Sequence, residues 1–288
     1  MYTEDFEYYR ADSVDDAVAL LGEHDGSELL AGAQGILTRM KTGEESPPAL
    51  VDIGHLDGLS AVETDGGTLS VGALATHTEL ADSQAVADHA AALSDAAGEV
   101  GDVQVRNGGT IGGNLAHGDP RSDPPAAVLA LDGSVVVQGP EGERTIDAAD
   151  LFDGSFETAV GEREVVTSLE IPLDGNAGSA YHKRRNPLSG YAMVGVAASV
   201  RLDGGTVSEA RVGVTGIEDR PFRLDAVEDR LEGETVDDEL RSAAGEAASA
   251  AVDPDELRSD PQSSGEFRAH LLSVDTERVL ADAVERAR

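Results

Sequence analysis

The stretch from residue 110 to residue 125, TIGGNLAHGDPRSDPP, restricts the fold more than any other part of the chain. It places two adjacent glycines, three prolines and two aspartates between segments with ordinary globular patterning. Glycine lets the backbone approach a ligand closely, and proline fixes the direction of the chain. We therefore expect a rigid loop that holds backbone and side-chain groups around a bound molecule.

The length and the absence of cysteine limit the number of folded units and the kinds of chemistry that the chain can carry. A chain of 288 residues exceeds one core of ordinary size, so we expect two packed units. The start, MYTEDFEYYR, is acidic and aromatic, unlike a signal peptide, and no run of 18 apolar residues occurs, so we expect a soluble cytoplasmic chain without membrane insertion. Without cysteine, this polypeptide forms no disulfide, thiolate nucleophile or cysteine-ligated iron–sulfur cluster.

The charge balance narrows the class of partner. The chain has 56 acidic and 21 basic residues, a formal charge of −35, so nucleic acid and anionic lipid are poor partners, because the field of the protein repels polyanions, and we expect no nucleic acid partner. The acids are spread along a chain that is 40% hydrophobic, which indicates a solvated acidic shell around a normal core. We expect a halophilic protein of a high-salt cytoplasm, where salt screens charges within about 3 Å at molar strength. A moderately halotolerant acidic protein is the alternative.

The patterning predicts an α+β fold, because strands and helices do not alternate regularly enough for a doubly wound sheet. We expect a helix over 13–22, capped by Ser13, and a helical turn in 35–41. Further helices are expected over 83–100, after SDPP, and over most of the tail from Pro221. Expected strands include ELLAG, PPALVDIG, a hairpin around DGG, SVVVQG, ERTIDA, EVVTSLEIP, YAMVGVAASVRLD and TVSEARVGVTGI. We place a boundary near residue 175, which gives domains 1–175 and 176–288.

The segment LLAGAQGILTRMK, residues 29–41, is the first candidate for a binding site. It ends a strand and enters a turn that contains Gly32 and Gly35, so the amides of residues 33–36 are predicted to point at a phosphate. Plain turn geometry is the alternative. The dinucleotide fingerprint G-x-G-x-x-G is absent, which argues against a Rossmann site.

The segment TIGGN supplies a second glycine pair, flanked by the hydrogen-bonding side chains of Thr110 and Asn114. Two such segments are predicted to grip a pyrophosphate between them with backbone amides and hydroxyls, without lysine. Asp123 either accepts a hydrogen bond from a ribose or ribityl hydroxyl or caps the helix PPAAVLAL.

Other chemistries lack a residue set. His117 and Asp119 are spaced like a metal pair, but the other histidines are scattered and no H-E-x-x-H motif occurs, so no metal site is predicted. The hydrolase elbow G-x-S-x-G is missing. The stretch 179–198 is aromatic and basic and includes Lys183, Arg184 and Arg185. Three interpretations are open: it covers a flavin ring, it binds an acidic partner, or it is a strand edge with charged ends.

These segments resemble one known family. GDVQVRNGGTIGGNLAHGDPRSDPPAAVLALDG strongly resembles the glycine loop of the flavoprotein (medium) subunit of molybdenum hydroxylases of the xanthine dehydrogenase and aerobic carbon monoxide dehydrogenase type. LLAGAQGILTRMK resembles that family's other flavin loop. SAYHKRRNPLSGYAMVGVAA, ARVGVTGIEDRPFRL and SGEFRAHLLSVDTERVL resemble its C-terminal domain, so the likeness runs through nearly the whole chain in order.

The resemblance implies a vanillyl-alcohol-oxidase-type (PCMH-type) FAD-binding domain in two lobes, about 1–56 and 57–175, followed by a small antiparallel sheet with helices. It implies that the pyrophosphate and adenosine side of FAD is held by Leu29, Leu30, Ala31, Gly32, Ala33, Gln34, Gly35, Ile36, Thr110, Ile111, Gly112, Gly113 and Asn114. Asp123 would reach a flavin-chain hydroxyl, and Tyr191 would lie near the isoalloxazine. The family usually has a second glycine where Ala33 stands, a serine or threonine near Gln34 and Gly35, and often an arginine where Gly108 stands.

The function that follows is electron transfer. The chain is expected to hold non-covalent FAD, to receive electrons from iron–sulfur clusters and to pass them to an external acceptor. An iron–sulfur small subunit and a molybdenum large subunit would be its partners, in a dimer of heterotrimers. No acid–base pair adjoins the glycine segments, so no catalytic residue is predicted. The alternatives are a free-standing FAD oxidase or reductase and a scaffold without cofactor.

Overall fold

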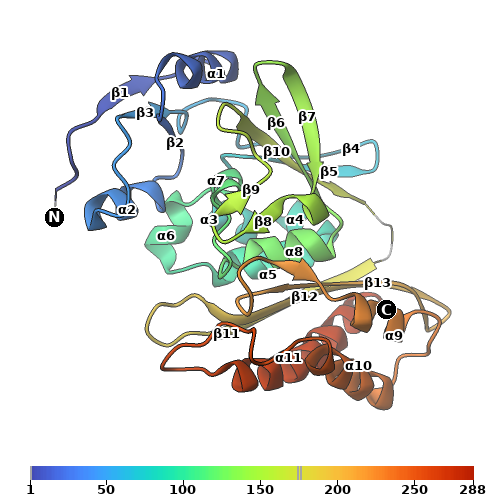
Figure 1. Cartoon of the computed structure of the whole chain (residues 1–288). Coiled ribbons are helices and arrows are strands. Elements are labelled where there is room, and N and C mark those ends of the chain that lie inside the picture. Colours follow the sequence, from blue (N-terminus) through green and yellow to red (C-terminus); the bar gives the residue numbers. More distant parts are fainter. Residues whose placement is uncertain (1, 174, 176) are drawn as a thin grey trace.

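The computed structural model describes residues 2–173, 175 and 177–288, and it builds the chain in three successive parts (Figure 1). The first part is a parallel sheet in the order β1-β3-β2. Its elements are β1 (Glu7–Arg10), α1 (Val14–Glu23), β2 (Glu28–Leu30), α2 (Ile36–Thr42) and β3 (Ala49–Asp52). As predicted, Ser13 caps α1, and its Oγ accepts a hydrogen bond from the Asp16 amide at 3.1 Å.

The second part is an antiparallel sheet in the order β4-β5-β10-β6-β7, covered by short helices. Its strands are β4 (Val62–Asp65), β5 (Thr68–Gly72), β6 (Ser134–Gly139), β7 (Gly142–Asp147) and β10 (Val165–Pro172), with the small pair β8 (Phe152–Gly154) and β9 (Glu157–Thr158). Its helices are α3 (His77–Asp82), α4 (Gln84–His89), α5 (Ala91–Glu99), α6 (Val103–Gly108), α7 (Ile111–His117) and α8 (Pro124–Ala130), with a 3-10 turn at Ala148–Asp150.

The helix expected over 83–100 is two helices, α4 and α5. The chain breaks at Ala90, whose backbone leaves the helical region with φ −143° and ψ 52°. A side chain from the C-terminal sheet stabilises the break, because the Ser179 Oγ accepts a hydrogen bond from the Ala92 amide at 3.1 Å. Alanine periodicity does not reveal a break that depends on a partner 87 residues away.

The glycine segment expected as a loop is also different, since residues 111–117 form α7. Thr110 caps this helix, and its Oγ1 accepts a hydrogen bond from the Gly113 amide at 3.3 Å. Ile111 and Leu115, four residues apart, are both fully buried, so they anchor one face of the helix in the core. A cap and two buried side chains thus outweigh the low helix propensity of two glycines.

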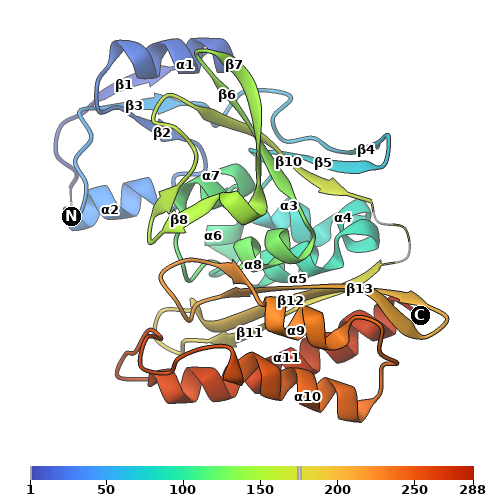
Figure 2. The same cartoon turned by 45° about the vertical axis from the view of Figure 1, so that its right-hand side comes forward.

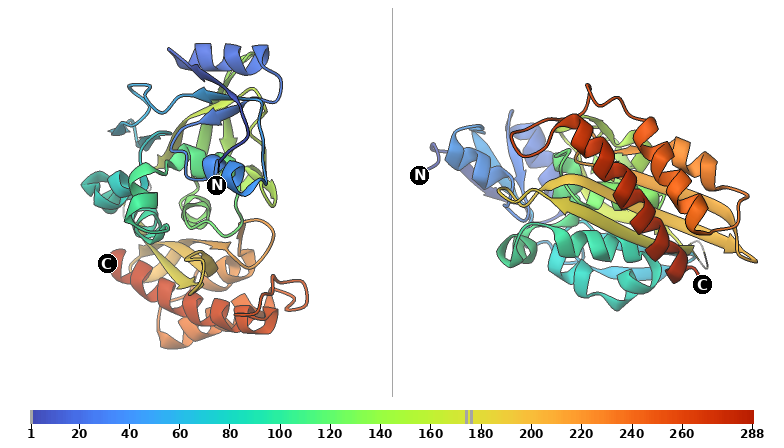
Figure 3. Two further views of the ribbon diagram at one scale, coloured as in Figure 1. Left: turned by 90° about the vertical axis from the view of Figure 1, so that its left-hand side faces the viewer. Right: turned by 90° about the horizontal axis from the view of Figure 1, so that it is seen from below.

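The third part is an antiparallel sheet in the order β11-β12-β13-β14, between two layers of helices (Figures 2 and 3). Its strands are β11 (Ala177–Arg185), β12 (Ala192–Asp203), β13 (Thr206–Thr215) and β14 (Phe222–Arg223). Helices α5 and α8 pack on one face, and α9 (Asp225–Leu231), α10 (Asp238–Ala250) and α11 (Gly265–Arg286) cover the other. The predicted order, an α+β domain followed by a small antiparallel sheet with helices, is confirmed.

The second and third parts share a core. Tyr181 and Ala197 of the C-terminal sheet are buried in the same apolar cluster as Leu93, Val128 and Leu129. The predicted boundary near residue 175 falls beside residues 174 and 176, which lie outside the described residues. The two units are therefore joined by continuous packing, and the boundary itself stays a prediction.

Candidate functional site

The first predicted loop has main-chain donors without acceptors. Leu29 and Leu30 end β2, residues 31–35 form the turn, and Ile36 begins α2. Over the part of the chain that the structure describes, the amides of residues 33–36 donate no hydrogen bond to a protein acceptor. Ala33 has φ +63°, a conformation that costs an L-residue about 1–2 kcal/mol. This turn therefore retains unsatisfied donors and strain at its centre.

The first loop lies directly against the residues that lead into the second segment. A Cβ on Gly32 would stand 2.0 Å from the Gly108 carbonyl oxygen, so only glycine permits this approach. A Cβ on Gly108 would likewise meet the Gln34 Nε2 at 2.6 Å, and Nε2 donates a hydrogen bond to the Gly32 carbonyl at 3.3 Å. The structure thus brings the first loop against the residues that lead into the second segment, although Gly32 and Gly108 are 76 positions apart in the sequence.

The second segment corrects one part of the prediction, because its amides have intramolecular acceptors. Those acceptors are Ala75 O for Ile111, Ala73 O for Gly112, Thr110 Oγ1 for Gly113 and Thr110 O for Asn114, at 2.8–3.3 Å. The predicted backbone cradle is therefore wrong for this segment. It presents to a ligand the Cα of Gly113, where an added Cβ would meet Thr110 Oγ1 at 2.9 Å and no other atom of the described residues within 4 Å.

Asn114 fixes the following loop. Its side-chain amide donates a hydrogen bond to the Ser122 Oγ at 2.7 Å, and Ser122 Oγ donates to Asn114 Oδ1 at 3.0 Å. The Thr215 hydroxyl lies 2.9 Å from the carbonyls of both Pro120 and Ser122. The proline-rich loop is thus held from α7 on one side and from β13 on the other.

Asp123 is the centre of a buried polar cluster between the two units. Its side chain accepts hydrogen bonds from the Tyr181 hydroxyl at 2.6 Å and from the Lys183 Nζ at 2.8 Å, and Nζ also donates to the Glu99 carbonyl. Burial raises the pKa of Asp123 to about 6, although the Lys183 charge opposes the shift. The capping alternative is wrong, because Asp123 already has helical angles and makes no side-chain bond to α8.

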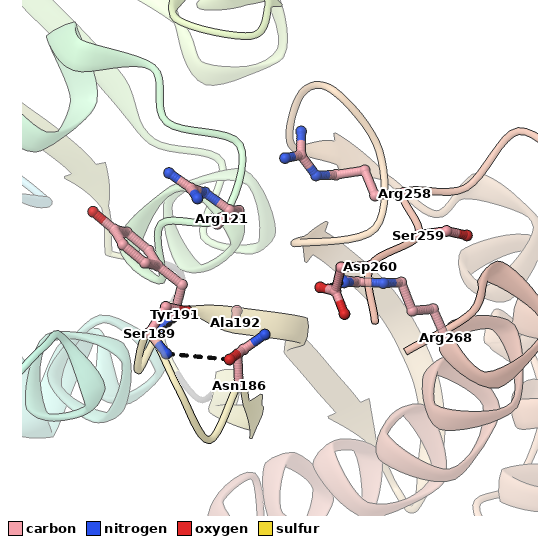
Figure 4. A pocket seen from close by; sticks show the side chains of 9 residues that line it. All are labelled: Arg121, Asn186, Ser189, Tyr191, Ala192, Arg258, Ser259, Asp260 and Arg268. Atoms are coloured by element: carbon pink, nitrogen blue, oxygen red, sulfur yellow. Dashed lines mark hydrogen bonds and ion pairs between the residues drawn. The ribbon is translucent and has the colours of Figure 1, made fainter. Parts of the chain in front are cut away.

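Tyr191 lies at the edge of a cavity of about 180 Å³ between the β11–β12 turn, the loop after Pro120 and the residues before α11 (Figure 4). The Arg121 guanidinium stands 4.3 Å from the centre of the Tyr191 ring and forms two side-chain hydrogen bonds to Asp119, at 2.8 and 2.9 Å. Burial alone would raise the pKa of Asp119, but its bonds to Arg121 outweigh burial and lower it. Tyr191 is 41% exposed, so its ring is accessible.

The basic stretch of β11 is neutralised internally. Lys183 pairs with Asp123, Arg184 with the buried Asp275 at 2.8 Å, and Arg185 with Glu99 at 3.0 Å. The stretch is therefore a strand with charged ends, and the hypothesis of a free cationic docking patch is wrong. Its turn instead exposes the apolar Leu188, which is 78% accessible.

The described residues contain no group of three metal-ligating side chains, and no described helix combines the length and apolarity needed to cross a bilayer. The spacing of His117 and Asp119 has another explanation. His117 contacts Arg39 and the ring of Phe156, whereas Asp119 pairs with Arg121.

Comparison with known proteins agrees with this arrangement. Residues 4–174 match the family model described as the FAD binding domain in molybdopterin dehydrogenase, and residues 179–283 match the CO dehydrogenase flavoprotein C-terminal domain. The chain belongs to the family of FAD-binding medium subunits of molybdenum hydroxylases.

Three relatives show how far the likeness extends. The chain is 30% identical to the glyceraldehyde dehydrogenase medium chain of Sulfolobus acidocaldarius, over 98% of this chain and 99% of that one. It is 36% identical to the carbon monoxide dehydrogenase medium chain of Hydrogenophaga pseudoflava, over 88% and 90%. A solved carbon monoxide dehydrogenase from Hydrogenophaga pseudoflava matches with a TM-score of 0.94 and 34% identity, over 99% of both chains.

The local geometry of this medium subunit fits FAD. The first loop has four amides that find no acceptor among the described residues, a set that suits a pyrophosphate, and Gly113 presents no side chain to a ligand. The roles of Lys183, Tyr181 and Arg121 were not predicted from the sequence. Lys183 carried a weak signal, because it is one of only two lysines in the chain.

Proposed function

We propose that this subunit binds FAD non-covalently between its two glycine segments, receives electrons from iron–sulfur clusters and passes them to an external acceptor. The observation that carries the proposal is the first loop. Its amides at 33–36 have no acceptor within the described part of the chain, and its Gly32 and Gln34 lie against Gly108, which leads into α7. Bound FAD supplies the redox chemistry, and the chain binds and orients it.

The proposed contacts fall into two groups. Residues 29–36 and 110–114 hold the pyrophosphate and adenosine side, with the donors coming from the first loop and close approach permitted by Gly113. Asp123 faces a flavin-chain hydroxyl, and Tyr191 adjoins the isoalloxazine. Each Asp123 oxygen already accepts one hydrogen bond, from Tyr181 or Lys183, and keeps a second lone pair for the ligand. No acid–base pair is assigned, because relayed electrons require no proton-abstracting side chain.

The FAD proposal is tested on the purified full chain. The protein should be yellow, and acid denaturation should release all of its flavin into the supernatant. Gly113→Val should abolish FAD binding with little change in circular dichroism, because its branched side chain would occupy the place proposed for the ligand beside Thr110. Asp123→Ala should weaken FAD by about 1.5–3 kcal/mol, the value of a charge-assisted hydrogen bond. A colourless protein that ignores added FAD at high salt contradicts the proposal.

The electron source must lie in partner chains, since this chain contains no cysteine for a cluster. We place the chain in a dimer of heterotrimers with an iron–sulfur small subunit and a molybdenum large subunit. Tagged protein isolated from its own cells at high salt should bring both partners with it, and the native mass should equal twice the heterotrimer. A chain that purifies alone and turns over a small substrate would support a free-standing flavoenzyme instead.

The surroundings are proposed to be a high-salt cytoplasm. A charge of −35 on 288 residues destabilises the compact state through self-repulsion, and salt relieves that repulsion. Thermal unfolding should therefore occur at higher temperature in molar KCl than in dilute buffer. Equal melting temperatures in the two solutions would contradict this part of the proposal.

A further inference from the structure

Arg39 of α2 turns back toward the first loop. Side chains in a helix lean toward its N-terminus, and Arg39 follows this rule. Its Nη1 stands 3.7 Å from the position that a Cβ on Gly35 would take. The guanidinium is therefore placed beside the main-chain donors of residues 33–36, and its side chain is only 22% exposed.

The protein contacts of Arg39 leave its donors poorly used. Nη1 lies 2.7 Å from Nδ1 and 2.6 Å from Nε2 of His117. Because the lone-pair directions of these two nitrogens diverge, one N–H group cannot align with both. Nε lies 2.6 Å from the Glu45 Oε1, yet it makes no hydrogen bond within the described residues. Arg39 thus has a neighbouring charge but few well-directed acceptors.

His117 shapes this arrangement without adding charge. Burial lowers its pKa, and the Arg39 charge lowers it further. Its ring also packs against Phe156, with 5.0 Å between the ring centres. A neutral ring fixed from behind holds the guanidinium near Gly35 without adding a negative charge, and Glu45 supplies the carboxylate that pairs with Arg39.

A cation beside four unused amides matches an anion with several oxygens. We propose that Arg39 is a further FAD-binding residue, which donates to the pyrophosphate at the first loop while His117 positions it. This inference rests on the proposed function. Glu45 then competes with the pyrophosphate for the Arg39 guanidinium, because the Glu45 carboxylate forms an ion pair with Arg39 Nε.

The test measures FAD affinity of the full chain at fixed KCl by quenching of flavin fluorescence. Arg39→Gln should weaken FAD about 10- to 100-fold, as expected for loss of a charge-assisted hydrogen bond. Arg39→Lys should recover part of that loss, because it restores the charge without the fork of donors. Glu45→Gln should tighten FAD, because it removes the competing carboxylate. The matched control is Lys41→Gln, which removes an exposed positive charge from the same helix and should leave affinity unchanged.

Melting of the FAD-free proteins separates binding from folding. Arg39→Gln should melt at the wild-type temperature without FAD and gain less from added FAD. His117→Ala should weaken FAD in the wild-type background and have no further effect in Arg39→Gln, as a positioning residue must. Equal affinity of Arg39→Gln and wild type, or an equal loss in Lys41→Gln, overturns the inference. Failure of the wild-type chain itself to bind FAD refutes the proposed function instead.

Discussion

The two glycine segments differ in whether their main-chain amides have hydrogen-bond acceptors in the protein. In the first loop, the amides of residues 33–36 have no acceptor among the described residues, and Ala33 is held at φ +63°. In the second segment, Thr110 and the carbonyls of Ala73 and Ala75 take the amides of residues 111–114, and the chain forms a capped helix. The first loop therefore has free main-chain donors to offer to the proposed FAD, whereas the second segment uses its amides to form a rigid helix.

This difference shows that glycine-rich sequence does not by itself mean a phosphate-binding backbone. Gly112 is needed because a Cβ there would stand 2.5 Å from the Ala73 side chain, which is a packing requirement. Gly32 is needed because its loop touches the Gly108 carbonyl. Gly113 differs from both, because among the described residues a Cβ there would meet Thr110 Oγ1 alone within 4 Å, at 2.9 Å, so of these three glycines we expect Gly113 to meet the ligand directly.

The largest expected effect breaks the contact between the two segments. In Gly32→Val, the new Cβ would lie 2.0 Å from the Gly108 oxygen, so one segment must move away from the other. We expect a loss of about 4 kcal/mol in unfolding free energy and loss of FAD binding, the range of severe backbone clashes. Urea unfolding at high KCl measures the first and flavin content the second. Gly98→Ala is the control, because its Cβ would have only Ala81 nearby, at 3.9 Å.

The next effect concerns His77, which packs against the residue before the second segment, Gly109. Its amide donates a hydrogen bond to the Gly109 carbonyl, and its side chain is 2% exposed. Burial lowers its pKa to about 4, so the unfolded chain binds a proton between pH 6.5 and 4 that the folded chain does not. Stability should be full above pH 6.5 and fall by up to about 3 kcal/mol toward pH 4.

His77→Gln should lack this component of the pH dependence, and His89→Gln, which changes an exposed histidine, should keep it. Urea unfolding at pH 7 and pH 4.5 with constant KCl measures the difference. If the unfolding free energies of wild type and His77→Gln changed equally with pH, His77 would not stay neutral in the folded chain.

Two neighbouring glycines sharpen the comparison within the second segment. Gly112→Ala should cost about 2 kcal/mol of stability by overpacking against Ala73. Gly113→Ala should cost less stability than Gly112→Ala, since its new Cβ meets one hydroxyl oxygen, Thr110 Oγ1 at 2.9 Å, and not a packed side chain and backbone, but it should weaken FAD. Thermal melting without FAD and titration with FAD give the two readings. If both substitutions lower stability equally, Gly113 is a packing residue and faces no ligand.

The smallest effect is expected in the first loop. Ala33→Gly removes a left-handed conformation that costs the folded chain about 1–2 kcal/mol. Glycine also increases the conformational entropy of the unfolded chain, which lowers stability by about 0.5–1 kcal/mol. We expect a net gain of about 0.5 kcal/mol and FAD affinity equal to or above wild type. Lower stability in Ala33→Gly would mean that the Ala33 methyl group makes a compensating contact.

Patterns local in the chain were read correctly. Ser13 before an apolar stripe predicted α1, and the turn DGG predicted the β4–β5 hairpin. Glycine and proline also mark the two segments that we propose as the site, because these residues reflect special requirements of the backbone. The break at Ala90 and the helix at residues 111–117 were missed, because the Ser179 hydroxyl and the buried surroundings of Ile111 and Leu115 come from distant parts of the chain.

The sequence by itself determined the order of elements, the acidic character and, through resemblance, the family, and it drew attention to the two glycine segments that we propose as the site. Only the tertiary structure decided how the polar groups are used. It turned Asp123 from a possible helix cap into the partner of Lys183 and Tyr181, and it neutralised the basic strand β11 with Asp275 and Glu99. The physical reason is that a side chain's hydrogen bonds and charge depend on which distant groups share its desolvated surroundings, and those groups meet only when the layers pack.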